Sequence, residues 1–482
     1  MKERILDLQR ASEILEPTER ERRFLENSAI EYSDQFLNRM PGGHAYRKEK
    51  QQVHSLLTEP LSEEPMELPA ILKNLDEKVF QSGLNASSGG QLGFIPGGGL
   101  FGSAVADYLA AVTNPYTGIY YSSPGSVCVE TRLIRWMAGL AGYPASAGGY
   151  LSSGGSLANL TAVVAARENA EIQPKDVEKS VVYLTDQTHH CVDRALRISG
   201  MGSCVIRHIP TDDRMRMDPH RLEETIEEDL KSGLKPWLVV ASAGTTNSGS
   251  IDPLAEIGKI TRQAGTWYHV DAAYGGCFLV TEQGKENLKG IEQSDSVVID
   301  PHKGFFVPYG LGALIVRDEE KLAAAFQAEA DYLQDTRIDQ PARSPADLSP
   351  ELSKHFRGLR LWLPLKLYGL QAFRSALEEK LLLAHYAWRE LNGIDSVETG
   401  PEPDLSVVTF RALPDHGDPE LWNRRLLDKI VADGRIYITS TRIGGIYMLR
   451  VAVLTLRTHL EDLDRFLMIL KEKIDELKSE QG

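Results

Sequence analysis

The chain of 482 residues is 42% hydrophobic and 25% charged, which is the composition of a globular protein long enough for two to three domains. Its 68 acidic residues exceed its 53 basic ones, and the net charge of −15 argues against nucleic acid or an anionic membrane as a partner. The four cysteines are scattered, and no apolar run has the length of a signal sequence or a membrane span, so a reduced, cytoplasmic compartment is predicted.

The N-terminal residues 1–85 are predicted to form a helical segment. Ile5, Leu8, Ala11 and Leu15 recur at helical spacing and make a partial apolar stripe. Such a stripe packs either on its own domain or on another chain, and the pattern alone leaves both open.

Residues 81–125 are rich in Gly, Ser, Asn and aromatic side chains. Gly97, Gly99 and Gly102 have the spacing of a dinucleotide fingerprint, but the stretch lacks the βαβ pattern of such a site, so we reject a nicotinamide site. The composition favours the wall of a substrate pocket. No Lys, Arg or His lies between Phe80 and Thr131, which favours a substrate with an aromatic or otherwise uncharged side chain.

From about residue 150 to 320, short apolar runs alternate with helical patterns, which predicts an α/β domain with a mainly parallel sheet. The predicted strands are 181–184, 204–208, 237–241, 266–270, 296–299 and 311–316. The predicted helices include 156–170, 190–199, 219–231 and 253–264.

Two places in this domain suit an anionic ring compound. The first place is the Ser/Gly-rich stretch that ends with Gly155 and Ser156 at the start of a predicted helix. Its glycines, hydroxyls and free N–H groups can bind a phosphate, or they can simply cap the helix. Asp271 follows the strand at 266–270, where a carboxylate can keep a pyridine nitrogen protonated. A helix cap or a turn residue is the alternative for Asp271.

Lys303 is the candidate nucleophile. Pro301 ends the strand at 296–299 and delivers Lys303 to its carboxyl end, where α/β folds place their chemistry. The flanking residues are apolar, namely Val297, Val298, Phe305, Phe306 and Val307. Such surroundings disfavour the ammonium form, and the resulting amine can form a Schiff base with an aldehyde cofactor. The alternative is a surface lysine at a strand end.

The run His189, His190 and Cys191 opens a predicted helix and raises the question of a metal site. Adjacent residues on a helix point in different directions and no spaced partner is evident, so we predict no metal. Further on, the polar, proline-containing run 331–345 is predicted to be a mobile lid that carries Tyr332. A helix at 371–391 and strands at 407–411, 436–439 and 448–453 predict a smaller C-terminal α+β domain.

Four motifs in fixed order resemble those of the pyridoxal-phosphate-dependent group II amino acid decarboxylases, which include aromatic-L-amino-acid, histidine, tyrosine and glutamate decarboxylases. The motifs are Ser153-Gly154-Gly155-Ser156-Leu157-Ala158-Asn159, Asp186-Gln187-Thr188-His189, Asp271-Ala272-Ala273-Tyr274 and Asp300-Pro301-His302-Lys303. The resemblance implies the transferase-like fold of aspartate aminotransferase (fold type I). It implies a large cofactor-binding α/β domain at 86–360, a small domain at 361–482, and packing of the segment 1–85 on a partner subunit.

The resemblance also implies roles for individual residues. The implied catalytic residues are Lys303, His189, Tyr332 and Asp271. The implied cofactor-binding residues are Gly155, Ser156, His189, Thr246, Asp271, Ala273, Asp300, His302 and Lys303. His189 is expected to stack on the cofactor ring, and Tyr332 to protonate the substrate carbon after carbon dioxide leaves. Because a carboxylate beside a phosphate is unfavourable, Asp300 is expected to act through its backbone or a neighbour.

The implied function is decarboxylation of an L-amino acid to the primary amine and carbon dioxide, in a homodimer with the active site at the subunit interface. Three alternatives stay open: an aldehyde synthase, aminotransferase or lyase on the same fold; a decarboxylase for acidic or diamino acids; and a catalytically silent homologue that acts as a scaffold. The presence of Lys303, Asp271 and His189 argues against the last of these.

Overall fold

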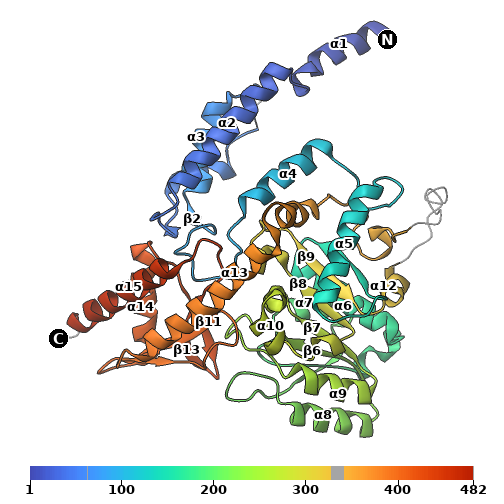
Figure 1. Cartoon of the computed structure of the whole chain (residues 1–482), viewed down its shortest axis with the longest axis vertical. Coiled ribbons are helices and arrows are strands. Elements are labelled where there is room, and N and C mark those ends of the chain that lie inside the picture. Colours follow the sequence, from blue (N-terminus) through green and yellow to red (C-terminus); the bar gives the residue numbers. More distant parts are fainter. Residues whose placement is uncertain (62, 327–340, 481–482) are drawn as a thin grey trace.

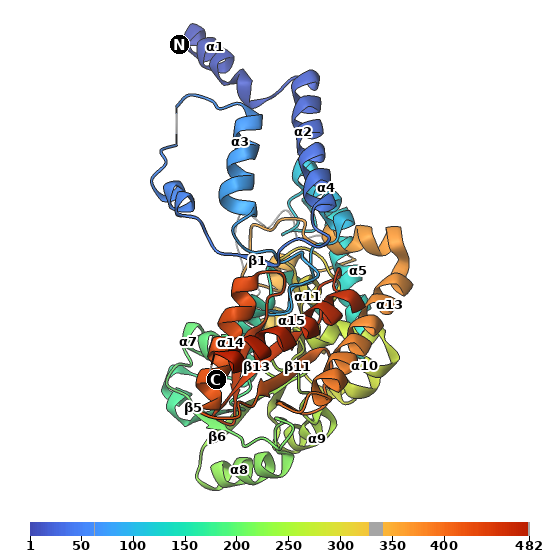
Figure 2. The same cartoon turned by 90° about the vertical axis from the view of Figure 1, so that its left-hand side faces the viewer.

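The computed structural model describes residues 1–61, 63–326 and 341–480 of the chain. A large α/β body carries a smaller domain built from the C-terminal residues, and an arm of N-terminal helices projects from both (Figures 1 and 2). Tyr332 and most of the run 331–345 lie outside the described residues.

The elements follow one another along the chain in this order. The described strands are β1 Tyr46–Arg47, β2 Gly83–Leu84, β3 Gly148–Ser152, β4 Ser180–Leu184, β5 Val205–His208, β6 Lys235–Ser242, β7 Trp267–Asp271, β8 Ser296–Ile299, β9 Gly312–Val316, β10 Val397–Thr399, β11 Val407–Ala412, β12 Thr439–Ile443 and β13 Ile446–Ala452. The described α-helices are α1 Lys2–Ser12, α2 Glu19–Asn38, α3 Leu68–Leu75, α4 Phe101–Thr113, α5 Pro124–Leu140, α6 Gly155–Asn169, α7 Cys191–Ile198, α8 Pro219–Lys231, α9 Leu254–Ala264, α10 Glu282–Asn287, α11 Pro301–Gly304, α12 Glu319–Phe326, α13 Leu359–Asn392, α14 Pro419–Asp433 and α15 Leu460–Ser479.

The large sheet has the strand order β3-β9-β8-β7-β6-β4-β5, and β9 runs antiparallel to both of its neighbours while the other pairs are parallel. This confirms the predicted α/β domain with a mainly parallel sheet. The strand β3 was not predicted, because it begins with two glycines, which strands disfavour. Gly149 is needed there, since a Cβ on it would lie 2.0 Å from the carbonyl oxygen of Leu314 on β9.

Both faces of the large sheet are buried. Along β4, Val181 and Tyr183 contribute to one core and Val182 and Leu184 to the other, because successive side chains of a strand point to opposite faces. Helices α6, α7 and α12 cover one face, and α5, α8, α9 and the start of α13 cover the other. The loops at the carboxyl ends of the parallel strands are therefore held on a rigid, two-sided scaffold.

The small domain is an antiparallel sheet of order β10-β11-β13-β12, covered by α14, α15 and the second part of α13. The predicted strands at 407–411 and 448–453 are confirmed, but the strand predicted at 436–439 is displaced, since β12 begins at Thr439. Residues before it pair instead with the chain near residue 91, where the amide of Leu92 donates to the carbonyl of Tyr437 at 2.8 Å. Because α13 runs through the expected boundary at 360/361, the bounds of the three units stay a prediction.

The N-terminal arm exposes its apolar residues. Within the described chain α1, α2 and α3 contain no buried residue. Ile5 is 57% exposed, Leu8 53% and Leu15 81%, so the stripe does not pack on its own domain. None of the described helices combines the length and apolar character needed to cross a bilayer, and the cellular compartment stays a prediction.

Candidate active site

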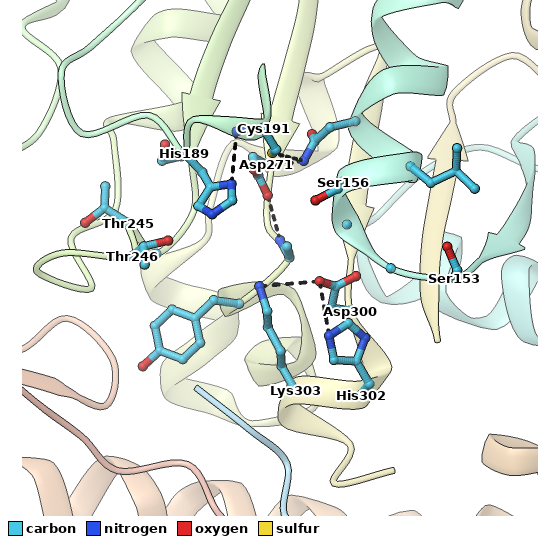
Figure 3. A pocket seen from close by; sticks show the side chains of 18 of the residues that line it. Ser153, Ser156, His189, Cys191, Thr245, Thr246, Asp271, Asp300, His302 and Lys303 are labelled. Atoms are coloured by element: carbon cyan, nitrogen blue, oxygen red, sulfur yellow. Dashed lines mark hydrogen bonds and ion pairs between the residues drawn. The ribbon is translucent and has the colours of Figure 1, made fainter. Parts of the chain in front are cut away.

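A cavity of about 310 Å³ opens at the carboxyl ends of β6, β7 and β8, between the starts of α6 and α7 (Figure 3). Its volume suits a small organic molecule. Every predicted cofactor-binding residue lines it, namely Gly155, Ser156, His189, Thr246, Asp271, Ala273, Asp300, His302 and Lys303. The structure therefore brings together residues that lie up to 148 positions apart in the sequence, while Tyr332 lies outside the described residues.

The start of α6 forms one wall of the cavity. Gly154 precedes the helix with φ of +157°, and no side chain of the described residues caps it. The first N–H groups of the helix therefore face the cavity, where the helix dipole also favours an anion. His302 lies beside this wall, and its Nδ1 donates to the carbonyl of Leu311 at 2.7 Å, which leaves Nε2 toward Asp300 at 3.7 Å. An uncapped helix start with an imidazole beside it is suited to a phosphate group.

The amine of Lys303 meets a carboxylate. Lys303 lies on the short helix α11, and its Nζ is 3.4 Å from Asp300 Oδ2. The sequence predicted apolar surroundings for the amine of Lys303. This prediction is wrong, because Phe305 and Val307 are buried in the core of the sheet instead. The Lys303 side chain remains 24% exposed, so a molecule in the cavity can reach it.

Asp300 points its carboxyl group into the site rather than acting through its backbone alone. The residue is 2% exposed, and its Oδ1 has no hydrogen-bond partner among the described residues. Burial raises the pKa of this carboxyl above its ordinary value, although the positive charges of Lys303 and His302 act in the opposite direction.

Asp271 ends β7 and lies deeper in the cavity. Its Oδ1 accepts a hydrogen bond from the amide of Ala273 at 3.0 Å, and its Oδ2 accepts one from Asn159 Nδ2 at 3.0 Å. Three residues later, the hydroxyl of Tyr274 lies 2.6 Å from Ser406 Oγ and accepts a hydrogen bond from the Ser406 amide at 2.7 Å. These bonds tie the Asp271 segment to the small domain, and burial raises the pKa of Tyr274 to about 12.

Behind Asp271 lies a buried chain of hydrogen bonds that the sequence did not reveal. Asn159 Oδ1 is 2.7 Å from His269 Nε2, and His269 Nδ1 is 2.8 Å from Ser296 Oγ, which accepts from Trp267 Nε1 at 2.9 Å. Burial lowers the pKa of His269 to about 4, so the ring carries one proton. Because the Asn159 amide donates to Asp271, that proton lies on Nε2, and every donor in the chain points toward Asp271.

This chain of hydrogen bonds explains why three polar residues occupy inward positions in otherwise apolar elements. Asn159 lies on the buried face of α6, and His269 and Ser296 are paired neighbours on β7 and β8. A polar residue at such a position is a signal of a buried network. The sequence could show the residues but not their pairing, which depends on the register of two strands.

His189 and Lys303 point into the cavity from opposite sides (Figure 3). His189 Nδ1 accepts a hydrogen bond from the Cys191 amide at 3.3 Å, and burial lowers the pKa of its ring. Thr246 lies exposed at the rim of the cavity. Cys191, which the sequence offered only as a metal candidate, lines the cavity, and burial raises the pKa of its thiol to about 12.

The residues fit pyridoxal phosphate. The uncapped start of α6 suits its phosphate, Asp271 suits a pyridine nitrogen, and the Lys303 amine suits its aldehyde. A Cβ on Gly155 would lie 2.8 Å from Asp300 Oδ2 and 3.3 Å from Ala273 Cβ, so glycine keeps the cradle open. Asp300 Oδ2 lies 3.4 Å from Lys303 Nζ and 3.7 Å from His302 Nε2, so this carboxyl lies among the groups that would hold the cofactor.

Comparisons with known proteins point the same way. A family model described as the pyridoxal-dependent decarboxylase conserved domain matches residues 50–413. The chain is 32% identical over 430 residues to aromatic-L-amino-acid decarboxylase of Bacillus atrophaeus, with 88% of this chain and 89% of the relative covered. It is 28% identical over 419 residues to phenylacetaldehyde synthase of Arabidopsis thaliana, with 83% and 85% covered.

The architecture also agrees with a solved structure. The crystal structure of Oryza sativa TDC with PLP and tryptamine matches with a TM-score of 0.90 at 23% identity, over 96% of this chain and 99% of that one. This likeness confirms the predicted fold class, a large α/β domain with a mainly parallel sheet and a small C-terminal domain.

Proposed function

Because this chain belongs to the pyridoxal-dependent decarboxylase family, we propose that it converts an L-amino acid with an aromatic or otherwise uncharged side chain into the primary amine and carbon dioxide. Family membership makes the protein a carboxy-lyase that uses pyridoxal phosphate. The substrate class and the plain decarboxylation are our proposal. The observation that carries it is the cavity in which Lys303, Asp271 and the start of α6 meet.

Each residue of the cavity has a proposed place around the cofactor. Gly155, Ser156 and His302 would hold the phosphate, and Lys303 would hold the aldehyde carbon through its amine. His189 would cover one face of the ring and Thr246 would help to orient it. When bound, pyridoxal phosphate supplies a ring that accepts the electrons left behind by departing carbon dioxide.

The protein's own groups then move and hold protons. Asp271 would keep a proton on the ring nitrogen, supported by the donors of Ala273 and Asn159. Tyr332 would deliver a proton to the substrate carbon, a role that rests on the resemblance alone. Placing the carboxylate across the ring plane is an orientation effect of the cavity walls.

The structure supports an uncharged substrate through the side chains that line the cavity, although none of the described lining residues comes from the glycine-rich stretch 81–125. The glycine-rich stretch lies against the lysine segment, where the amide of Gly97 donates to the carbonyl of His302 at 3.2 Å. Among the described residues that line the cavity, Lys303 is the one lysine or arginine, and the cofactor uses it. Arg457, which contacts the stretch, donates to the carbonyl of Gly98 at 2.6 Å rather than facing the cavity.

The test is a product assay with a panel of amino acids: tyrosine, DOPA, tryptophan, histidine, glutamate, aspartate and diaminobutyrate. We expect carbon dioxide and the matching amine in equal amounts from at least one aromatic amino acid, measured by mass spectrometry. Turnover of glutamate or diaminobutyrate alone would overturn the substrate class. Ammonia and an aldehyde as main products would overturn plain decarboxylation.

Substitution of Tyr332 by phenylalanine also tests whether the protein forms an amine or an aldehyde. If the Tyr332 hydroxyl delivers the proton to carbon, Tyr332→Phe in air loses amine formation and gains aldehyde and ammonia with the same substrate, because dioxygen then takes two electrons and leaves as hydrogen peroxide. The ratio of aldehyde to amine is the measurement. An unchanged ratio in Tyr332→Phe would remove Tyr332 from the mechanism and leave the family assignment intact.

We also propose that a second copy of this chain covers the N-terminal arm. The exposed apolar residues of α1 and α2 continue on α4, where Val105 is 40% and Leu109 43% exposed. Light scattering should give twice the chain mass of 53.4 kDa. Deleting residues 1–40 should shift the mass toward a single chain. A full-length protein that stays monomeric at high concentration would contradict the dimer.

A further inference from the structure

We propose that Asp300 carries a proton when the cofactor is bound, and that the resulting carboxylic acid donates a hydrogen bond to the cofactor's phosphate. The inference rests on the cofactor site proposed above and assigns Asp300 a chemical state within it. It makes retention of the cofactor dependent on pH.

The position of the Asp300 carboxyl is fixed. A Cβ on Gly155, the first residue of α6, would lie 2.8 Å from Oδ2, and a Cβ on Gly312, the first residue of β9, would lie 2.6 Å from Oδ1. The carboxyl is therefore wedged between two backbone segments and cannot swing away. A phosphate bound at the start of α6 must lie next to it.

Several charged or titratable groups face this carboxyl. Lys303 Nζ is 3.4 Å and His302 Nε2 is 3.7 Å from Oδ2. Asp271 adds a negative charge from the end of β7. The thiol of Cys277 donates to the backbone carbonyl of Asp300 at 3.6 Å, and the thiol of Cys191 lies farther off at the start of α7. The positive charge in direct contact with the carboxyl thus comes from Lys303, with His302 as the second candidate.

Cofactor binding shifts the balance of charges around Asp300 toward the protonated carboxyl. Once the Lys303 nitrogen is bonded to the cofactor, it no longer serves Asp300 as a free ammonium partner. The phosphate meanwhile brings a second anion beside a buried carboxyl, and two adjacent anions in a buried site favour sharing of a proton. A proton taken from solvent turns Asp300 from a repelling acceptor into a donor, with Oδ2, the oxygen that lies near Lys303 and His302, as the atom that donates to the phosphate. Burial raises the pKa of this carboxyl even before the phosphate arrives.

Infrared difference spectroscopy of the loaded minus the unloaded wild-type protein tests the protonation directly. We expect the carbonyl stretching band of a protonated carboxylic acid to appear on loading at neutral pH. The band should shift when aspartate is labelled with ¹³C and be missing in Asp300→Asn. As a control, Asp295→Asn removes another largely buried carboxyl whose pKa is raised and should leave the band unchanged. A loaded wild-type protein without the band would overturn the proposal.

The affinity for pyridoxal phosphate gives a second measurement. The asparagine amide donates at every pH, whereas the carboxylic acid must hold its proton. Between the pKa of the Asp300 carboxyl in the unloaded protein and its pKa in the loaded protein, the ratio of dissociation constants, wild type over Asp300→Asn, should therefore rise with pH by up to about tenfold per unit. A flat or falling ratio would overturn the proposal. A protein to which borohydride fixes no cofactor at Lys303 would instead refute the proposed cofactor site itself.

Discussion

Substitution of Lys303 by alanine should lower decarboxylation by roughly a thousandfold or more, because the covalent hold on the cofactor aldehyde is lost. The wild-type protein should be yellow, and borohydride should bleach it and fix the cofactor to Lys303. Neither should occur in Lys303→Ala. Mass spectrometry of the peptide that contains residue 303 provides the measurement.

A matched control separates the covalent role from the ion pair with Asp300. Lys303→Arg keeps a positive charge near Asp300 Oδ2 but cannot form the bond to the aldehyde. We expect it to be as inactive as Lys303→Ala. If Lys303→Arg kept most of the activity, the lysine would serve only as a counter-ion and the proposed mechanism would fail.

Substitution of Asp271 by asparagine should lower kcat by roughly 10²- to 10³-fold while the cofactor still attaches to Lys303. The neutral amide cannot keep a proton on the ring nitrogen, so the ring accepts electrons less well. Measurements of kcat together with borohydride fixation distinguish this loss from loss of cofactor. A variant Asp271→Asn with nearly wild-type kcat would show that the ring nitrogen needs no acid.

The hydrogen-bond chain behind Asp271 provides the control for that substitution. In Asp271→Asn the single carbonyl oxygen of the new amide can face either the Ala273 amide or Asn159 Nδ2. When it faces Ala273, the new NH₂ group meets Asn159, which rotates and presents its own NH₂ group to His269 Nε2. The His269 proton should then move from Nε2 to Nδ1, which ¹⁵N NMR of the imidazole can detect. Asn159→Ala keeps the Asp271 charge and should cost less activity than Asp271→Asn.

Much of the fold could be predicted from local patterns. The strands β4 to β9 have apolar runs bounded by turn residues, and all were expected within two or three residues of their observed bounds. The strand β3 was missed because Gly148 and Gly149 resemble a loop, and they are tolerated only because β9 needs a close approach. The displaced β12 reflects a pairing of Tyr437 with residues near 91, which is far away in sequence.

In the candidate site, too, local positions could be predicted from the sequence whereas tertiary contacts could not. Lys303, Asp271 and Gly155 could be proposed because each stands at the end of a strand or the start of a helix, where the sequence itself marks the position. The environment of each group could not be predicted. The contact of Lys303 with Asp300 and the link from Asp271 to Trp267 both depend on tertiary packing.

The hydrogen bonds between Tyr274 and Ser406 connect the large domain to the small one. Tyr274 follows Asp271 by three residues, and Ser406 lies one residue before β11 of the small domain. A swing of the small domain would pull on the loop that sets the direction of the Asp271 carboxylate. The hydrogen bonds of Tyr274 therefore couple the position of the small domain to the segment that carries Asp271, although the small domain contributes none of the residues that line the cavity in the described chain.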